Sequence, residues 1–512
     1  MLIKVFGAAV QGIDATLITI EVNSSRGCMF YLVGLPDSAV KESHQRIISA
    51  LQVNGYRIPT SNIIINMAPA DIRKEGSAYD LPLAIGMLAA GEVIQPDKLN
   101  RYLMMGELSL DGSLQPIKGA LPIAIKAREL GFEGIIVPRQ NALEAAVVNQ
   151  IQVYGVENIK EVIEFFNGKQ ELTPTIVNTR EEFYAQQSSF DLDFADVKGQ
   201  ENVKRALEVA AAGGHNIILI GAPGSGKSML AKRLPSILPP LSLGESLETT
   251  KIHSVAGRLQ NNTGLISKRP FRDPHHTIST VAMTGGGSYP QPGEISLAHN
   301  GILFLDELPE FNRSVLEVLR QPLEDRKITI SRVKSNVESP ASFMLVASMN
   351  PCPCGYYNHP TKACVCSPGQ VQKYLNRISG PLLDRIDLQI EVVPVPFEKM
   401  SDAHPGEASS IIRERVISAR QIQENRYADI PGVYCNAQMS SKLLSLYARP
   451  DDKGLALLKN AMNRLNLSAR AYDRILKVAR TIADLENSDL IQPSHLAEAI
   501  GYRNLDREDW AG

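Results

Sequence analysis

A glycine-rich loop between an apolar run and a helical pattern is the strongest chemical signal in this sequence. The run Asn216–Ile220 predicts a short buried strand, and the loop begins at the next residue. Glycines let the backbone fold around phosphates so that several N–H groups point inward, and the following helix adds its positive N-terminus. We therefore predict a nucleotide site at Gly221, Ala222, Pro223, Gly224, Ser225, Gly226, Lys227 and Ser228.

The lysine and serine that end this loop indicate the nucleotide chemistry to expect. Lys227 can reach the β- and γ-phosphates, and the Ser228 hydroxyl can bind magnesium. The expected cofactors are therefore ATP and a magnesium ion. A flexible glycine loop is the alternative, and the strand before the loop and the helix after it argue against that alternative.

Two carboxylates follow an apolar run further along the chain. Ile302–Leu305 predicts a strand that ends at Asp306 and Glu307. Asp306 can hold magnesium, and Glu307 can orient a water molecule for in-line attack on the γ-phosphate. Because acids often follow strands before turns, this motif gains its weight from the glycine-rich loop that precedes it.

Composition narrows the class of protein. The chain has 512 residues, is 44% hydrophobic and carries a formal net charge of −2, so any attraction to DNA requires local clusters of Lys and Arg. The first residues contain no signal-like apolar stretch, and no apolar run approaches the length of about 18 that spans a membrane. Six cysteines are too few for a disulfide scaffold in a chain of this length. We expect a cytoplasmic protein with no membrane association.

The pattern of predicted elements divides the chain into four parts and indicates an α/β fold class. Strand-like and helical runs alternate in the first part, and a polar segment without periodicity then indicates a linker. A second α/β region follows the linker, and the remainder is mostly helical. The predicted boundaries are 1–168, 169–190, 191–396 and 397–512.

Three further motifs resemble those of AAA+ ATPases in type and in order along the chain. An apolar strand ends at Asn350, Arg385 lies in the segment 381–387, and Arg470 opens a late helix. The resemblance implies that Asn350, as sensor 1, helps to place the attacking water. It also implies that Arg385 is an arginine finger and that Arg470 belongs to sensor 2. An ordinary surface arginine is the alternative for both.

Four longer segments extend the resemblance to nearly the whole chain, and they are similar to the magnesium-chelatase-like, or ComM/YifB, family of bacterial AAA+ ATPases. The resemblance implies a homo-hexameric ring with an N-terminal Lon-protease-like α/β domain, an AAA+ core and a C-terminal helical lid. It also implies an ATP-dependent helicase for branch migration when incoming single-stranded DNA recombines in natural transformation. Single-stranded or branched DNA and the recombinase machinery would be its partners. The segments are Asp193–Gln200, Phe271–Thr277, Pro292–His299 and Ser468–Asp484.

Two parts of the AAA+ region resemble insertions that replicative MCM helicases share with magnesium chelatase. One would interrupt an early helix near residues 258–288, and the other would be a hairpin at about 327–343, where alternating residues favour strands. The resemblance implies DNA contacts in the pore of a ring, and a solvated basic turn is an equal alternative for the hairpin. The cations concerned are Lys268, Arg269 and Arg272 in the first insertion, and Arg332 and Lys334 near the tip of the second.

The N-terminal region resembles Lon proteases without their catalytic pair. Residues 74–84 resemble the Lon segment that carries the nucleophilic serine, and residues 106–119 resemble the segment before the catalytic lysine. Alignment places Ala78 at the serine and Leu121 in the region of the lysine. Because a hydroxyl nucleophile needs a base within reach, we expect no protease activity. A slip of one residue, which would use Ser77, is the alternative.

Four of the six cysteines lie within a short segment directly after Asn350. Their spacing is C-x-C-x₉-C-x-C, and four thiolates suit a closed, structural zinc site. The C-x-C arms are tighter than those of common zinc sites, so reduced thiols without metal remain the alternative. The predicted zinc ligands, in a knuckle spanning 352–366, are Cys352, Cys354, Cys364 and Cys366.

The competing functions differ in what they require of the chain. A chelatase-type motor that remodels a protein partner is the main alternative to a DNA motor, and the Lon-like front argues against it. An ATP-dependent protease is disfavoured because the serine–lysine pair is missing. The adjacent His275 and His276 are expected to have a structural or inter-subunit role instead of binding metal.

Overall fold

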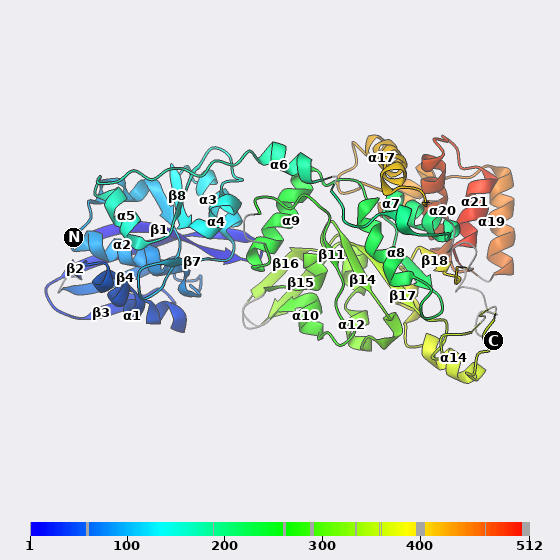
Figure 1. The fold of residues 1–512 in the computed structure, drawn as a ribbon, viewed down its shortest axis with the longest axis horizontal. Coiled ribbons are helices and arrows are strands. Elements are labelled where there is room, and N and C mark those ends of the chain that lie inside the picture. The colour runs from blue at the N-terminus through cyan, green and yellow to red at the C-terminus, as the bar shows by residue number, and fades with distance from the viewer. Residues whose placement is uncertain are drawn as a thin grey trace. The chain divides into compact units, whose positions relative to one another are not determined.

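The computed structural model divides the chain into two compact units (Figure 1). The first comprises Met1–Gln186 and Ser242–Ser267, and the second comprises Gln187–Leu241 and Lys268–Gly512. The structure describes residues 2–57, 61–187, 189–259, 263–286, 291–332, 335–357, 359, 361–395, 405–465 and 467–503.

A mixed seven-stranded sheet forms the core of the first unit, with the order β3-β4-β2-β1-β5-β8-β9. β1 and β2 pair antiparallel in a long hairpin, and alternate residues such as Val5 and its partner Ile20 are fully buried. This period of two shows that one face of the hairpin is covered. The strands are β1 (Leu2–Gln11), β2 (Asp14–Ser25), β3 (Phe30–Val33), β4 (Asn62–Ala68), β5 (Tyr102–Met104), β8 (Gly134–Pro138) and β9 (Gln152–Val156), with a short ribbon of β6 (Glu107–Leu108) and β7 (Leu114–Gln115).

Helix α2 covers the β1–β2 hairpin and is buried along its whole length. A helix that is apolar on all sides can be stable only inside a core, and the sequence DLPLAIGMLAA has that pattern. Gly86 lets the helix come close, since a Cβ there would lie 2.8 Å from Cγ2 of Val22. The helices of this part of the chain are α1 (Ser38–Val53), α2 (Asp80–Ala90), α3 (Ala120–Glu129), α4 (Arg139–Ala145), α5 (Ile159–Phe166) and α6 (Thr179–Gln186).

A segment from the middle of the chain completes the first unit. Helix α9 (Leu243–Val255) packs against α3, and the Ser254 carbonyl accepts a hydrogen bond of 3.1 Å from the Gly119 N–H. Lys251 Nζ lies 2.6 Å from the Asp14 carboxylate. This organisation differs from the predicted boundaries, which placed the segment within 191–396, because such long-range contacts leave no local signal. The predicted linker also differs, because it contains α6, whose Phe183 is buried.

The second unit is built around a parallel five-stranded sheet in the order β11-β14-β17-β10-β18. Its three central strands consist of buried residues only, as expected for a parallel sheet covered on both faces. Carboxyl ends of neighbouring parallel strands meet at one edge, so residues that follow these strands lie close together. The strands are β10 (Ile217–Ile220), β11 (Phe271–Arg272), β14 (Ile302–Leu305), β17 (Met344–Met349) and β18 (Leu388–Glu391).

Short helices accompany this sheet, and they connect the strands that carry the predicted site. Helix α7 packs against β18, and α8 is the next element after β10. The helices are α7 (Glu201–Gly213), α8 (Lys227–Arg233), α10 (Thr280–Thr284), α11 (Glu294–Leu297), α12 (Arg313–Glu317), α13 (Arg320–Asp325), α14 (Pro368–Leu375) and α15 (Gly380–Leu383), with a ribbon of β12 (Gly285–Gly286) and β13 (Gln291–Pro292).

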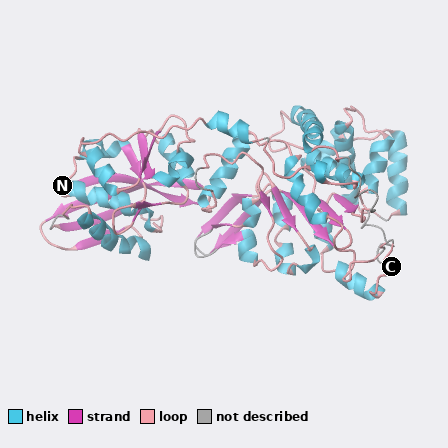
Figure 2. Ribbon diagram, viewed as in Figure 1, coloured by secondary structure: helices cyan, strands magenta, loops and turns pink. Residues whose placement is uncertain are grey.

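The C-terminal part of the second unit is helical, as the sequence predicts (Figure 2). Helix α20 buries a stripe that includes Ile475, Ala479 and Ile482, which lie three to four residues apart as on one helix face. It packs against α7, so the helical region and the sheet share one hydrophobic core. The helices are α17 (Ser409–Arg426), α18 (Ser441–Tyr447), α19 (Asp452–Arg464), α20 (Ala469–Leu485) and α21 (Pro493–Gly501).

The hairpin predicted before sensor 1 is confirmed. Strands β15 (Lys327–Arg332) and β16 (Ser335–Pro340) pair antiparallel, with Arg332 opposite Ser335. Lys334 lies outside the described residues, and the side chain of Arg332 is not described either. Their predicted contact with DNA therefore stays a prediction.

Candidate nucleotide-binding and catalytic site

The glycine-rich loop joins β10 to α8 and turns around the ammonium group of Lys227. Gly224 and Gly226 have φ angles of +77° and +93°, which glycine adopts without the strain that a side chain would cause. Lys227 Nζ donates hydrogen bonds of 2.7 Å to the Gly221 carbonyl and 3.0 Å to the Ala222 carbonyl. Burial lowers the pKa of Lys227, against the opposing effect of two nearby carboxylates.

Donor groups of this loop suit a phosphate ligand. The Ser225 hydroxyl is buried and has no hydrogen-bond partner among the described residues. An unpaired buried polar group is costly, and a ligand oxygen could satisfy it. The start of α8 at Lys227 adds the positive end of the helix dipole to the same place. These groups fit the phosphates of a nucleotide.

The strand that precedes Asn350 brings its amide to the loop. Asn350 Oδ1 accepts a hydrogen bond of 3.2 Å from Lys227 Nζ, although the two residues lie far apart in sequence. The N–H of Gly221 donates to the Met349 carbonyl at 3.2 Å, which fixes the loop to the end of β17. The predicted sensor residue and the predicted phosphate-binding lysine thus lie in direct contact.

The predicted magnesium ligands also contact one another. The Ser228 hydroxyl donates to Asp306 Oδ2 at 2.7 Å, and the Ser348 hydroxyl donates to the other oxygen of the same carboxylate. Serine and aspartate oxygens are the hard ligands that magnesium prefers. Asp306 and Ser228 can therefore hold a magnesium ion, and Ser348 orients Asp306. Local sequence gave no signal for Ser348, which lies inside β17.

Glu307 lies beside this group with its side chain 58% exposed to solvent. Its backbone has the left-handed conformation (φ 55°, ψ 50°), which turns the chain sharply after β14. His276 Nδ1 is 3.8 Å from a carboxylate oxygen of Glu307, and its ring lies against that of His275. We expected only a structural or inter-subunit role for these histidines. The signal for this proximity is long-range, because β11, which precedes His276, pairs with β14.

The two predicted arginines lie apart from this group. Arg385 is 7% exposed and forms an ion pair with Glu324 of the same chain. Arg470 has a 65% exposed side chain, and its guanidinium is 3.0 Å from Asp384. The structure pairs each of them with a carboxylate of its own chain, and their predicted roles stay predictions.

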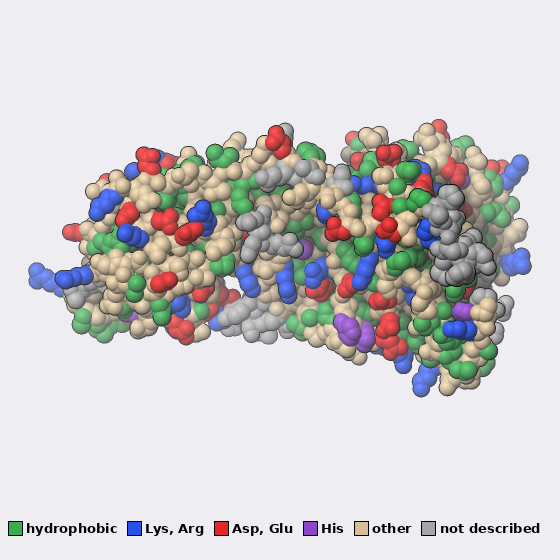
Figure 3. All heavy atoms as spheres, in the orientation of Figure 1, with side chains coloured by type: hydrophobic (Ala, Val, Ile, Leu, Met, Phe, Trp, Pro, Cys, Tyr) green, Lys and Arg blue, Asp and Glu red, His purple; other side chains and the backbone are tan. Residues whose placement is uncertain are grey.

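The basic residues of the first predicted insertion have partners within the second unit. The Arg269 guanidinium donates to the carbonyls of Pro239 and Asn300 at 2.7 and 2.8 Å. The ammonium of Lys268 lies 5.5 Å from the ring centre of Phe190. Arg272 forms a bidentate pair with Glu294. On the face drawn in Figure 3, Lys and Arg side chains are interspersed with Asp and Glu side chains.

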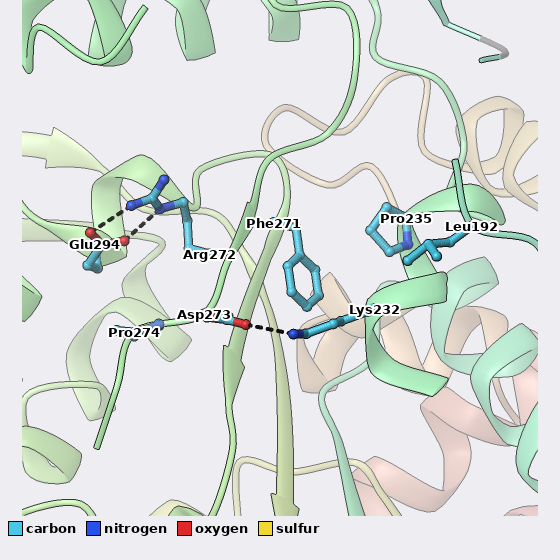
Figure 4. Close-up of a pocket in the computed structure, with 8 residues that line it drawn as sticks. All are labelled: Leu192, Lys232, Pro235, Phe271, Arg272, Asp273, Pro274 and Glu294. Atoms are coloured by element: carbon cyan, nitrogen blue, oxygen red, sulfur yellow. Dashed lines mark hydrogen bonds and ion pairs between the residues drawn. The ribbon is translucent and has the colours of Figure 1, made fainter. Parts of the chain in front are cut away.

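A cleft of about 550 Å³ lies beside α8 (Figure 4), and its lining includes neither Lys227 nor the residues that Lys227 contacts. Lys232 and Asp273 approach to 3.5 Å across it. Both of its cationic side chains are paired with carboxylates, so we assign it no ligand. Its lining residues are Leu192, Lys232, Pro235, Phe271, Arg272, Asp273, Pro274 and Glu294.

The four clustered cysteines bring their sulfur atoms together. All four lie within 4.8 Å of one another, and the Cys352 sulfur is 3.4 Å from that of Cys354 and 3.7 Å from that of Cys364. Zn–S bonds of about 2.3 Å in a tetrahedron place the sulfurs about 3.8 Å apart. Partial burial opposes ionisation of Cys354, yet backbone N–H groups of Tyr356 and Val365 lower the pKa of its thiol to about 6, whereas burial and hydrogen bonds to the Cys354 sulfur raise the pKa of the other three thiols. The cluster fits a tetrahedral zinc ion.

In the first unit, the segments that resemble the catalytic region of Lon proteases make other contacts than a serine–lysine pair would. The Ser77 hydroxyl donates to the Glu107 carboxylate, and Ala78 follows it in the chain. The buried ammonium of Lys74 donates to the Pro69 carbonyl. Leu121, in the region of the Lon lysine, is fully buried. None of these described contacts joins a serine hydroxyl to an amine.

The loop between β10 and α8, the acids after β14 and the amide after β17 define a P-loop domain of the AAA+ class. Comparison with known proteins agrees. The family descriptions "Magnesium chelatase, subunit ChlI", "Subunit ChlI of Mg-chelatase" and "Magnesium chelatase, subunit ChlI C-terminal" match residues 193–400, 20–141 and 406–503.

Whole-chain similarity identifies the family. Competence protein ComM of Haemophilus influenzae is 44% identical over 98% of this chain and 97% of its own length. YifB of Escherichia coli K12 is 44% identical over 98% of this chain and 96% of its own. The chain therefore belongs to the ComM/YifB family of magnesium-chelatase-like proteins. Lon protease 2 of Bacillus subtilis is 29% identical over 25% of this chain and 23% of its own, which supports the Lon-like resemblance.

In the described ranges, no helix combines the length and the apolar character that crossing a membrane requires.

Proposed function

We propose that the protein binds ATP with magnesium and hydrolyses it at the edge of the parallel sheet. The observation that carries this proposal is the convergence of Lys227, Ser228, Asp306 and Asn350 through hydrogen bonds of 2.7 to 3.2 Å. Lys227 and the loop N–H groups would hold the phosphates, while Ser228 and Asp306 would hold magnesium. The bound magnesium would neutralise charge on the phosphates.

Glu307 is the proposed base for the attacking water. Its carboxylate is exposed and next to Asp306, so it can reach a water molecule near the γ-phosphate. Asn350 would help to orient that water. A ring of identical subunits would supply Arg385 to the neighbouring site, where an arginine stabilises the charge of the transferring phosphoryl group. Arg470 would belong to sensor 2.

We further propose that hydrolysis drives movement on single-stranded or branched DNA, as a branch-migration motor in a hexameric ring. The similarity to a competence protein over the whole chain and the confirmed β15–β16 hairpin support this proposal. The Lys268 and Arg269 contacts within the second unit make the hairpin the better candidate for the DNA contact. The recombinase machinery would be a partner.

A chelatase-type motor that remodels a protein is the second candidate. The family descriptions favour it, because all three are those of magnesium chelatase. The sequence predicted that a Lon-like first unit would argue against this candidate, but one of the three chelatase descriptions matches residues 20–141 of that unit.

Zinc is the third proposed cofactor. The distances between the four sulfurs support it, and a site closed by four thiolates would be structural instead of catalytic.

The DNA proposal is tested with Lys334→Ala, because only locally concentrated cations can attract DNA to a chain of net charge −2. Binding to single-stranded DNA should weaken and its salt dependence should flatten, by about 0.7 in log–log slope for each phosphate that the variant no longer neutralises. Branch migration of a synthetic junction should be abolished while basal ATPase activity is kept.

Lys459→Ala, at an exposed lysine on α19, is the matched control for loss of charge. Loss of basal ATPase activity would make Lys334 part of the nucleotide site. A wild-type hexamer without DNA affinity at low salt would refute the DNA motor and favour the chelatase-type remodeller.

A further inference from the structure

A buried glycine of the cysteine cluster, Gly355, lies against the phosphate loop. Gly355 directly follows Cys354 in the chain, and its N–H donates to the Cys352 carbonyl at 3.0 Å. A Cβ at this position would lie 2.4 Å from Cδ and 2.8 Å from Cγ of Pro223. Pro223 belongs to the phosphate loop, so the turn that carries two zinc ligands packs directly against that loop.

A second connection runs through the backbone. Asn350, whose amide oxygen accepts from Lys227, is separated from Cys352 by Pro351 alone. Pro351 and Cys352 are both buried, and the residue before Asn350 accepts a hydrogen bond from the Gly221 N–H. A shift of Cys352 would therefore move Asn350 and also Met349, whose carbonyl fixes the start of the phosphate loop.

Burial of side chains contributes little to the shape of the described part of the cluster. Of the described residues in 352–366, only Cys352 and Gly355 are buried, and Val365 is 84% exposed. Such a segment buries too little apolar surface to offset the conformational entropy lost on ordering. Ligation by four thiolates supplies that free energy in small metal-binding segments.

We propose that zinc in the cysteine cluster holds the phosphate loop in its nucleotide-binding shape, so that loss of the metal weakens ATP binding. This inference rests on the proposed ATP and zinc sites. With the metal bound, Gly355 lies against Pro223 and limits the loop to one conformation. Without it, the turn and the loop gain alternative conformations, and the N–H groups no longer converge on the phosphates.

Gly355→Ala tests the contact without removing a thiol. Ordinary van der Waals contact begins near 3.4 Å, so the new Cβ and Pro223 Cδ must separate from 2.4 Å. We expect nucleotide affinity to fall at least about tenfold, which corresponds to the loss of about one hydrogen bond between a loop N–H and a charged phosphate oxygen. Zinc content should stay at one per chain. The readout is titration of the full chain with a fluorescent ADP analogue and magnesium.

Gly432→Ala is the matched control. Gly432 has a φ of +79°, close to the +84° of Gly355, but a Cβ there would meet nothing within 4 Å. The two variants therefore share the backbone strain of alanine at positive φ, and only one collides with the loop. We expect Gly432→Ala to bind nucleotide as the wild type does.

Metal removal is the second arm. Zinc is withdrawn from the wild-type chain with a thiol-competing chelator, the chelator is removed, and nucleotide affinity is measured in magnesium before and after one equivalent of Zn²⁺ is returned. Affinity should fall and then recover. Cys435→Ser, at a buried thiol outside the cluster, should keep its zinc and its affinity.

The outcomes separate this inference from its premises. A wild-type chain that binds no nucleotide refutes the proposed ATP site, and one purified without zinc refutes the zinc site and this inference with it. Unchanged affinity in folded, zinc-depleted protein, or in zinc-loaded Gly355→Ala, overturns the inference alone.

Discussion

Among the serine hydroxyls that donate to carboxylates are Ser77, bonded to Glu107 in the first unit, and Ser228, bonded to Asp306 in the second, and of these two pairs only the second is part of a candidate site. In the second unit, Ser228 donates to Asp306 at 2.7 Å, and Lys227 and Asn350 lie in the same group of contacts. In the first unit, Ser77 donates to Glu107, while Lys74 is buried against a carbonyl. A hydroxyl–carboxylate contact therefore says little about chemistry until further donors converge on it.

The fold explains the difference. Parallel strands β10, β14 and β17 end at one edge of their sheet, so each new strand adds a functional group to the same place. The first unit is held together by apolar packing such as that of α2 on the β1–β2 hairpin. That packing does not depend on a serine or a lysine, so such a fold can form without a catalytic serine–lysine pair.

The largest effects, on nucleotide binding and turnover, should come from residues next to the Ser228–Asp306 pair. Lys227→Ala should abolish nucleotide binding, because it removes the charge that meets the phosphates. Glu307→Gln should keep nucleotide affinity and lose turnover, since an amide cannot act as the base. Binding titrations and steady-state ATPase assays distinguish the two. Equal losses of affinity in both variants would contradict the assigned roles.

Loss of the proposed arginine finger should be next in size. Arg385→Ala should lower turnover by about 10³–10⁵, because an arginine supplied by a neighbour stabilises the transferring phosphoryl group. Mixing this variant with Lys227→Ala protein should restore some activity, since some interfaces then contain both groups. Verified mixed rings without recovery would show that Arg385 acts within its own chain, where it pairs with Glu324.

A smaller effect, on stability, should arise where the helical region supports the site. Burial alone would raise the pKa of Asp387, but Arg474 and His215 hold it well below its usual range. Such a group stabilises the fold above the unfolded-state pKa of about 3.9, and this contribution is lost as pH falls through the lower folded pKa.

Asp387→Asn should therefore destabilise the second unit by about 3–5 kcal/mol at pH 7, because it leaves Arg474 without its buried partner. Thermal unfolding of both proteins at pH 7 and at lower pH is the measurement. The difference in the free energy of unfolding between the two proteins should become smaller as the pH is lowered, since only the wild type has an Asp387 carboxylate to protonate. A constant difference would mean that the Asp387 charge contributes nothing.

The smallest effect is expected at the first pair. Ser77→Ala should leave ATPase activity and DNA binding unchanged, and wild-type protein should hydrolyse no unstructured protein substrate. The physical reason is that no amine within the described contacts can take the Ser77 proton. Proteolysis by the wild type that disappears in Ser77→Ala would contradict this comparison, because the Ser77–Glu107 pair would then belong to an active site as well.

Sequence alone predicted the parts of the site that are locally encoded. The phosphate loop and the acids after β14 follow from short patterns. The role of the amide after β17 and the β15–β16 hairpin came from a family resemblance, and the structure places the loop, the acids and the amide together. Contacts made by long-range packing were missed. The approach of His276 to Glu307 depends on the pairing of β11 with β14, and the pairing of Arg385 with Glu324 depends on a helix elsewhere in the chain.

The placement of α9 in the first unit means that the chain passes between the units three times, near residues 186, 241 and 267. The first unit therefore lacks one of its helices until residue 267 has left the ribosome, by which time the phosphate loop has already been synthesised. A chain that ends near residue 187 would lack α9, the helix that packs against α3. A chain that begins there would contain α9 without α3. The first unit can therefore be completed only after part of the second has been synthesised, whereas domains joined end to end can fold in turn.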